Sequence, residues 1–407
     1  MKIVVVPPHF EPDVAPTGVI FTRIVEELAK RGHEIEVITS LPWYRLHRVE
    51  DGYEGKLVRH EDTPWGRITR IHPFPTADKT NIPRRALSFA GFSSLAAAVG
   101  GRGGRADAVI AVSPPLTIGL TGWAIARLRG ARFVFNLQDI FPDVAIELGA
   151  LKNGRLVSAA RRLENLCYRL SDAITVLSDD LKVNIAAKGV DESKVHVIPN
   201  FVDTERMAPG PRENHYRKEF GLTGKTVVMY AGNIGLSQAF DSVLDAAGAL
   251  AYEEDLVFVI NGQGAQREAL QNKARGMTNV VFVDMQPVDR LPEVLAAADI
   301  HLVPLKKGLG NSSVPSKTYS ILAAGRPFVA SVDGGTEIVR IAERSGGGIA
   351  IPPEDPEALA KALRRMLDHP DETRRMGEQG RSFIEGWASP GAVAGAYESL
   401  LQELLRG

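Results

Sequence analysis

The chain has 407 residues, of which 44% are hydrophobic and 24% are charged, a composition typical of a globular protein with full hydrophobic cores. Its formal net charge of −1 argues against general nucleic-acid binding, and its single cysteine, Cys167, excludes an intrachain disulfide. It contains no apolar run of 18 residues, so we predict no transmembrane helix, and the short run at residues 3–6 predicts a first buried strand rather than a signal peptide. We therefore expect a cytoplasmic protein.

The first half alternates β-branched apolar runs with helical patterns, which indicates a parallel sheet with crossover helices. A helix is predicted over residues 18–32, because Ile20, Ile24 and Leu28 recur every four residues and Gly32 closes the pattern. The strands predicted in this half are residues 2–6, 34–40, 68–74, 108–113, 132–137, 173–178 and 195–199.

The second half repeats this plan after a polar connection, residues 200–225, which is rich in Pro and Gly and has no strand pattern. Its predicted strands are residues 226–232, 256–262, 280–284, 300–305, 327–331 and 348–352. We therefore predict two doubly wound α/β domains, residues 1–200 and 201–385, that face each other across a deep cleft. Ligands of such sheets bind at the carboxyl ends of the strands, so the loops behind the strands are the candidates for function.

Two loops of the first half carry candidate residues. Gly18 enters the first predicted helix and would let a phosphate approach its N-terminus, although a plain helix-start glycine is the alternative. Asp139, next to Gln138 and just past the strand at 132–137, would fix sugar hydroxyls, or else serve as a turn or N-cap residue.

Two loops of the second half carry polar or glycine-rich candidates. Asn233 and Gln238 follow its first strand and can donate hydrogen bonds to a phosphate or hydroxyl. The alternative for Asn233 is that it only stabilises the local turn or caps a helix. Gly262 and Gly264 follow the second strand. A dinucleotide-binding pattern would need a third glycine where Arg267 stands, so we favour tight turning near a ligand.

The strongest local signal is the segment from Pro315, which predicts a helix with Ser316 and Lys317 in its first turn. A lysine is unfavourable at the positive end of a helix dipole, unless an anion binds there. We therefore predict that the free amides of this turn and the Lys317 ammonium hold a diphosphate. A solvated surface lysine is the alternative.

Residues 79–105 contain five basic residues and no acidic one. Their apolar centre carries Phe89 and Phe92, and is too short to span a bilayer but long enough to lie in its interface. The charge is uneven as well, with 26 Lys and Arg against 22 Asp and Glu in residues 1–200, and 22 against 27 in the remainder. We therefore expect contact with an anionic membrane surface. The alternative is a core helix under the first sheet.

Taken together, several motifs resemble those of the retaining glycosyltransferases of the GT-B fold, family 4. The segments that carry the resemblance are RGHEIEVITSLPWY, VIPNFVDTERM, YAGNIGLSQAF, GQGAQREAL, LPEVLAAADIHLVPL, PSKTYSILAAGRPFVA and GGTEI. The resemblance covers most of the chain, and the subgroup it points to builds bacterial cell-surface polysaccharides such as O-antigen, capsule and exopolysaccharide. It implies a C-terminal helix, residues 386–407, that packs back on the first domain.

The chain departs from the usual pattern of that family. Asn233 and Gln238 stand where a typical member has Arg and Lys on the donor diphosphate, and Ser312 and Ser320 stand where it has two Glu. Gln138 replaces the usual His before Asp139. Lys317 thus becomes the main candidate cation.

The resemblance implies a hexosyl- or N-acetylhexosaminyltransferase that uses a nucleotide diphosphate sugar, which we expect to be a UDP-sugar, with no prosthetic group. No Asp-x-Asp motif appears between the predicted strands, so we expect no metal. The implied acceptor is a saccharide linked to a polyprenyl diphosphate, and the enzyme would work at the inner face of the cell membrane. The implied catalytic residues are Lys317, Asp139 and Gln138. The implied donor-binding residues are Gly18, Asn233, Gln238, Gly262, Gly264, Met285, Ser316, Lys317 and Ser320. The alternatives are a sugar-nucleotide 2-epimerase and a catalytically silent sugar-nucleotide-binding protein.

Overall fold

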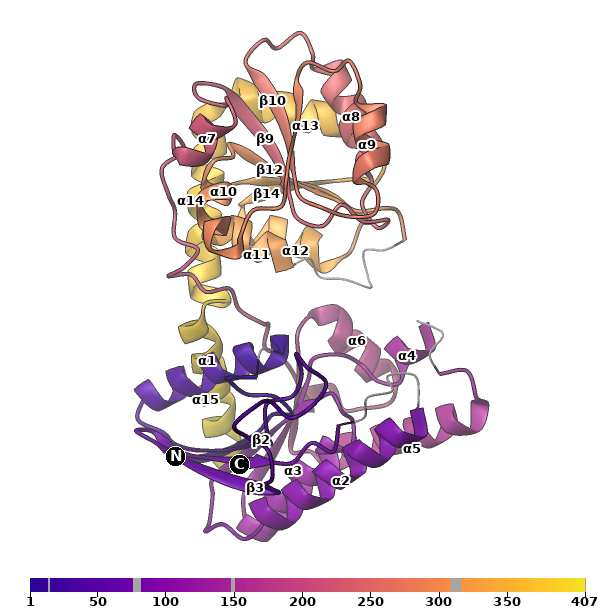
Figure 1. The fold of residues 1–407 in the computed structure, drawn as a ribbon, viewed down its shortest axis with the longest axis vertical. Helices are drawn as coiled ribbons and strands as arrows, with labels where there is room; N and C mark the ends of the chain where they lie inside the picture. The colour runs from indigo at the N-terminus through magenta and orange to yellow at the C-terminus, as the bar shows by residue number, and fades with distance from the viewer. Residues whose placement is uncertain (14, 76–81, 148–150, 309–315, 407) are drawn as a thin grey trace. The chain divides into compact units, whose positions relative to one another are not determined.

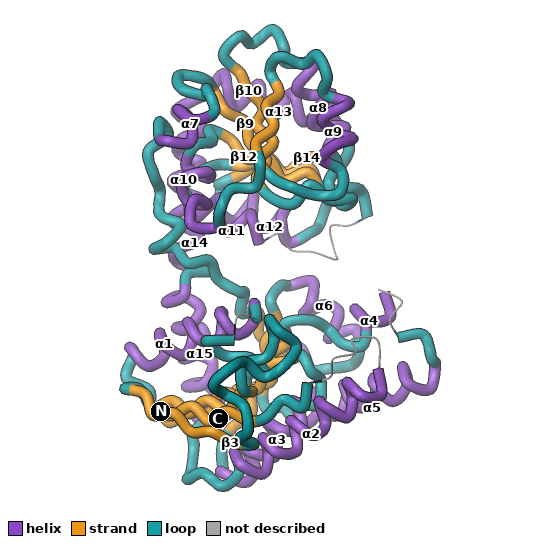
Figure 2. Tube along the Cα trace, viewed as in Figure 1, coloured by secondary structure: helices purple, strands orange, loops and turns teal. Residues whose placement is uncertain are grey.

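The computed structural model describes residues 1–406 apart from residues 14, 76–81, 148–150 and 309–315. The chain divides into two compact units, unit 1 (Met1–Asn200 with Val393–Gly407) and unit 2 (Phe201–Ala392). Each unit is a sheet between layers of helices (Figures 1 and 2). The predicted fold class, two Rossmann-like α/β domains, is confirmed.

Unit 1 contains an eight-stranded sheet in the order β3-β4-β2-β1-β5-β6-β7-β8. Its strands are β1 (Lys2–Val6), β2 (Glu34–Ser40), β3 (Val58–Thr63), β4 (Gly66–Ile71), β5 (Ala108–Ser113), β6 (Arg132–Leu137), β7 (Ala173–Val176) and β8 (Val195–Val197). All neighbours pair in parallel except β3, which is antiparallel to β4. The sequence analysis missed β3, because this edge strand pairs on one side only and its residues VRHEDT lack an apolar pattern.

The helices of unit 1 cover both faces of this sheet (Figure 1). They are α1 (Pro16–Lys30), α2 (Ile82–Gly100), α3 (Ile118–Arg129), α4 (Asp143–Glu147), α5 (Gly154–Leu170), α6 (Asp179–Ala187), η1 (Glu192–Lys194) and α15 (Pro390–Arg406). Helices α2, α3, α5 and α6 contribute to one core cluster with the sheet. The C-terminal helix α15 packs in unit 1, where Asn136 Nδ2 donates a 2.9 Å hydrogen bond to the Tyr397 hydroxyl and Glu398 pairs with Arg31 at 3.0 Å.

Unit 2 contains a six-stranded parallel sheet in the order β11-β10-β9-β12-β13-β14. Its strands are β9 (Thr226–Ala231), β10 (Leu256–Asn261), β11 (Val280–Val283), β12 (Ile300–Pro304), β13 (Phe328–Ser331) and β14 (Gly348–Ile351). Its helices are α7 (His215–Glu219), α8 (Phe240–Ala249), α9 (Arg267–Lys273), η2 (Val288–Arg290), α10 (Leu291–Ala296), α11 (Ser316–Ala323), α12 (Glu337–Ser345), α13 (Pro356–Asp368) and α14 (Pro370–Trp387). Helices α8, α9 and α13 pack on one face, and α7, α10, α11, α12 and α14 pack on the other.

The segment expected to be a plain connection, residues 200–225, is largely part of unit 2. It contains α7, whose Tyr216 and Arg217 are completely buried. The Arg217 guanidinium is satisfied by Asp299 at 2.7 Å and by the Ala297 carbonyl at 2.8 Å. The local sequence is mostly polar because buried ion pairing, together with the packing of Tyr216 in the core, fixes this helix.

Both sheets have a point where the strand order reverses. In unit 1 it lies at β1, which has β2 on one side and β5 on the other, and in unit 2 it lies at β9, between β10 and β12. The loops that leave neighbouring strands diverge there, which opens space for a ligand. Each unit therefore has one place where a ligand site is expected.

Candidate functional site

A cavity of about 340 Å³ lies at the reversal point of unit 2, and we call it the lysine cavity. Its wall combines the ends of β9 and β10, the loop after β11, and residues of α10 and α11. The lining residues are Ala231, Gly232, Asn261, Met285, Gln286, Leu291, Val294, Leu295, His301, Lys317, Ser320 and Ile321. Three of the residues predicted from sequence, Met285, Lys317 and Ser320, are therefore brought together.

Lys317 lies in the first turn of α11, and its Nζ is 4.0 Å from the centroid of the Tyr230 ring. Burial lowers the pKa of this lysine to about 8. No carboxylate among the described residues forms an ion pair with it, so the aromatic ring is its main stabilising contact. A cation held at a helix N-terminus without a counter-charge favours binding of an anion.

Two other polar side chains of the lysine cavity, His301 and Asn261, have partners in the protein. His301 is buried and its Nε2 lies 3.0 Å from the Leu295 carbonyl oxygen. Burial lowers the pKa of this histidine to about 4, so the ring is neutral near pH 7. Asn261 Oδ1 accepts a 2.9 Å hydrogen bond from the Tyr216 hydroxyl. Sequence reasoning missed both residues, although a lone histidine inside the apolar strand β12 is a visible signal.

Gly262 and Gly264 do not line the lysine cavity. A Cβ on Gly262 would lie 1.8 Å from the Gly232 carbonyl oxygen, and one on Gly264 would lie 2.3 Å from the Ile234 carbonyl oxygen. The two glycines thus let the loop after β10 pack directly on the loop after β9. Arg267, at the place of the third glycine of a dinucleotide pattern, donates to the Gly262 carbonyl and pairs with Asp284 at 2.7 Å.

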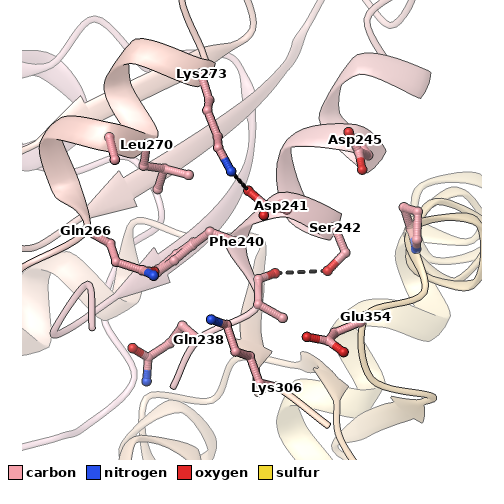
Figure 3. Close-up of a pocket in the computed structure, with 13 residues that line it drawn as sticks. Gln238, Phe240, Asp241, Ser242, Asp245, Gln266, Leu270, Lys273, Lys306 and Glu354 are labelled. Atoms are coloured by element: carbon pink, nitrogen blue, oxygen red, sulfur yellow. Dashed lines mark hydrogen bonds and ion pairs between the residues drawn. The ribbon is translucent and has the colours of Figure 1, made fainter. Parts of the chain in front are cut away.

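Asn233 and Gln238 also lie outside the lysine cavity. Asn233 is exposed. The Gln238 side chain accepts a 2.9 Å hydrogen bond from the Gly235 N–H and donates one of the same length to Ser237 Oγ. Gln238 lines a separate hollow of about 230 Å³, beside Lys306 and Glu354 (Figure 3). In that hollow Asp241 and Lys273 form an ion pair at 2.6 Å.

The candidates Gly18, Gln138 and Asp139 belong to unit 1. A Cβ on Gly18 would lie 3.0 Å from the Asp13 carbonyl oxygen, so α1 approaches the loop before it closely. The Gln138 amide donates to Asn136 Oδ1 at 2.8 Å and accepts from Asn200 Nδ2 at 2.9 Å. Asp139 lies at the surface, where partial desolvation raises the pKa of its carboxyl group.

Part of the predicted anion site lies outside the described residues, namely Ser312, Pro315 and the side chain of Ser316. Within the described residues, no group of three His, Cys, Asp or Glu side chains is arranged to hold a metal ion. No helix there is both long enough and apolar enough to cross a bilayer.

Two family models match the chain, one in each unit. Residues 17–200 match the model described as a glycosyl transferase 4-like domain, and residues 225–369 match the model described as glycosyl transferases group 1. The second model includes every lining residue of the lysine cavity.

Comparison with known proteins extends this match over most of the chain. A protein of Escherichia coli (strain K12) named as a colanic acid biosynthesis glycosyl transferase, WcaI, is 30% identical over 379 residues, which cover 90% of this chain and 92% of that protein. WbjE of Pseudomonas aeruginosa, named as a glycosyltransferase, is 28% identical over 304 residues, 72% of this chain and 75% of that protein.

The crystal structure of Anabaena Alr3699/HepE in complex with UDP has the same fold, with a TM-score of 0.67 at 13% identity, covering 99% of this chain and 100% of that chain. The two parallel-sheet units, the two family models and the relative at 30% identity agree with one another. The chain therefore belongs to the GT-B glycosyltransferases that combine a glycosyl transferase 4-like domain with a group 1 domain.

Proposed function

We propose that this glycosyltransferase moves a sugar, with retention of configuration, from a nucleoside diphosphate sugar to a saccharide acceptor linked to a polyprenyl diphosphate. The pathway would be synthesis of a cell-surface polysaccharide, in agreement with the colanic acid role in the name of WcaI. The observation that carries the donor half is Lys317, a partly buried cation with no acidic partner among the described residues.

The chemistry follows from the charge of the leaving group. As the bond between sugar and phosphate breaks, negative charge develops on the departing diphosphate. The Lys317 ammonium, already positioned over Tyr230, then stabilises the transition state more than the ground state. Ser320 and Met285 line the same cavity and would contact the remainder of the donor.

We propose UDP as the nucleotide, because a structure of the same fold was solved with UDP bound. The acceptor would occupy unit 1, residues 1–200, and the donor would occupy residues 201–385, with the C-terminal segment 386–407 supporting the first domain. Asp139 is the candidate that would hold acceptor hydroxyls. Gln138 has both ends of its amide in hydrogen bonds, so we assign it to positioning that loop.

A thermal-shift series with UDP-, GDP- and TDP-sugars tests the donor proposal. A ligand at about 100 times its dissociation constant adds about 2.7 kcal/mol to stability, so one nucleotide should raise Tm well above the others. Hydrolysis of that donor without acceptor, or transfer to acceptor, then separates a transferase from a silent binding protein. Loss of a deuterium label from C2 of the donor sugar would instead identify a 2-epimerase.

We also propose that the protein works in the cytoplasm, at the inner face of the membrane. Phe92 is 4% exposed and belongs to the core of unit 1. The inner face of α2 therefore packs in the core, which agrees with the core-helix alternative given in the sequence analysis. The contact would instead use exposed residues such as Leu87, which is 73% exposed, and Arg102 and Arg105.

A further inference from the structure

Unit 1 contains a second and larger cavity, of about 580 Å³, which we call the aromatic cavity. It lies where the loops leave β1, β2 and β5, the reversal point of this sheet. Much of its wall is apolar and aromatic, and includes Trp43, Phe89, Phe92, Phe141 and Leu163. A volume of this size has room for about 20 water-sized groups. The function derived above uses none of these residues.

Several polar side chains of this wall are bonded within the protein. The Ser40 hydroxyl donates a 2.7 Å hydrogen bond to the Pro8 carbonyl, and Thr117 Oγ1 lies 2.8 Å from Ser93 Oγ. A sugar ring needs many hydrogen-bonding partners, and a site without them penalises each hydroxyl that it desolvates. Apolar side chains outnumber polar ones in this wall, so it matches a hydrocarbon chain better than a saccharide.

One ionisable side chain of the wall is held in a fixed orientation. His9 Nδ1 lies 2.7 Å from Asp13 Oδ2, and the Asp13 side chain is completely buried. The other Asp13 oxygen accepts a 3.0 Å hydrogen bond from the Tyr44 N–H. The His9 ring also packs 5.6 Å from the Trp43 ring and 5.2 Å from the Tyr44 ring, between centroids. With Nδ1 engaged, Nε2 is the ring atom without a partner among the described residues.

We propose that the aromatic cavity binds the hydrocarbon chain of a lipid-linked acceptor, and that His9 Nε2 contacts the first oxygen-bearing group beyond that chain. This inference rests on the proposed function, because it takes the acceptor to be lipid-linked. It adds that the enzyme recognises the lipid itself, and that Asp13 acts as the positioning residue for His9.

The direct test measures binding of three probes to the full-length protein by equilibrium dialysis, namely farnesyl phosphate, farnesol and inorganic phosphate. We expect both farnesyl compounds to bind and inorganic phosphate alone not to bind. The proposal would be overturned if neither farnesyl phosphate nor farnesol showed saturable binding.

A pair of neighbouring alanines provides a matched control. Ala160 lines the aromatic cavity, whereas Ala159, next to it on α5, is exposed and does not line it. Ala160→Phe should fill part of the cavity, weaken farnesyl phosphate binding about tenfold and raise KM for a lipid-linked acceptor, with kcat and donor hydrolysis unchanged. Ala159→Phe should behave like wild type. Equal effects of the two substitutions would contradict the cavity assignment.

His9→Leu tests the polar contact separately. It should weaken binding of farnesyl phosphate or farnesol by several-fold while keeping the chain in the cavity, and Asp13→Asn should reproduce a smaller part of that effect. Unchanged affinities for both probes in His9→Leu would remove His9 from the proposal. Unchanged circular dichroism and an unchanged Tm without ligand show that unit 1 of both variants is folded.

Failure of this inference and failure of the proposed function give different results. If a nucleotide sugar binds and Lys317→Ala lowers turnover as expected, but lipid-free and lipid-linked acceptors have the same KM, the lipid site is wrong and the transferase function stands. If farnesyl phosphate binds but no nucleotide sugar does, the proposed function is wrong.

Discussion

The two units place their cavities at the same topological position and line them with different chemistry. In unit 2 the lysine cavity holds a cation that has no acidic partner among the described residues. In unit 1 the aromatic cavity holds a histidine that already has a buried carboxylate partner. An unpaired, partly buried cation favours an anionic ligand, whereas a paired histidine in an apolar wall does not require one. The shared topology explains why both cavities lie at a reversal point, and the loop residues explain why their walls differ.

The largest effect that separates the two cavities should come from Lys317→Ala. Removing one preorganised positive group from the leaving diphosphate should lower kcat by roughly 10²–10³. Steady-state transfer assays measure this, with Lys306→Ala as the control, because Lys306 lines the other hollow of unit 2 (Figure 3). Farnesyl phosphate binding should not change. Turnover near the wild-type rate would mean that the two cavities do not differ in the way described.

Gly232→Ala should damage the lysine cavity without removing its cation. Gly232 has φ +143°, and a Cβ there would lie 3.2 Å from Lys317 Nζ. For an alanine, strain of about 2 kcal/mol is expected in such a backbone conformation. If the loop relaxes to relieve this strain, nucleotide binding must restore the strained conformation, and nucleotide affinity should fall about thirtyfold. The control is Gly224→Ala, with φ +76° and no atom within 4 Å of the added Cβ. It should lower Tm but leave the Kd for nucleotide, measured by calorimetry, unchanged.

The pH dependence of nucleotide binding should distinguish the two cavities next. Because burial lowers the pKa of Lys317 to about 8, the free protein loses this positive charge as the pH rises from 7 to 9. Nucleotide affinity should therefore fall by up to about tenfold over that range, and binding at pH 9 should take up a proton.

Calorimetry in two buffers of different ionisation enthalpy measures that proton. Lys317→Arg provides the control, since a guanidinium keeps its charge throughout this range and should remove the pH dependence. A slope that persists in Lys317→Arg would assign it to another group. Farnesol binding, which involves no charge on the probe, should remain constant in the wild type.

The smallest expected effect concerns the membrane surface near unit 1. Replacing Arg102 by Gln should weaken co-sedimentation with anionic liposomes by at most about fivefold at low salt, because one basic residue near an anionic leaflet contributes about 1 kcal/mol. Arg275→Gln, at an exposed arginine of unit 2, is the control. Binding that is independent of anionic lipid and of salt would contradict the proposed contact.

Much of the fold was predictable because it depends on local patterns. Apolar β-branched runs such as Ala108–Ser113 are buried along their whole length, so their pattern alone indicates a central parallel strand. The opposite case is β3, whose polar residues pair at an edge that only β4 defines. Phe92 shows the same limit, since its segment was compatible with a membrane surface and with the core until the packing of α2 was known.

The sequence by itself determined the two α/β domains and the position of Lys317 at the start of a helix, because strand burial and the helix dipole act over a few neighbouring residues. Only the tertiary structure decided which groups meet in each cavity. The Tyr230 ring under Lys317, the Gly232 carbonyl against Gly262 and the Tyr44 N–H on the Asp13 carboxylate all depend on how separate loops pack. A buried charge is stabilised or left unpaired by residues that other segments supply, so its role becomes visible only when those segments are in place.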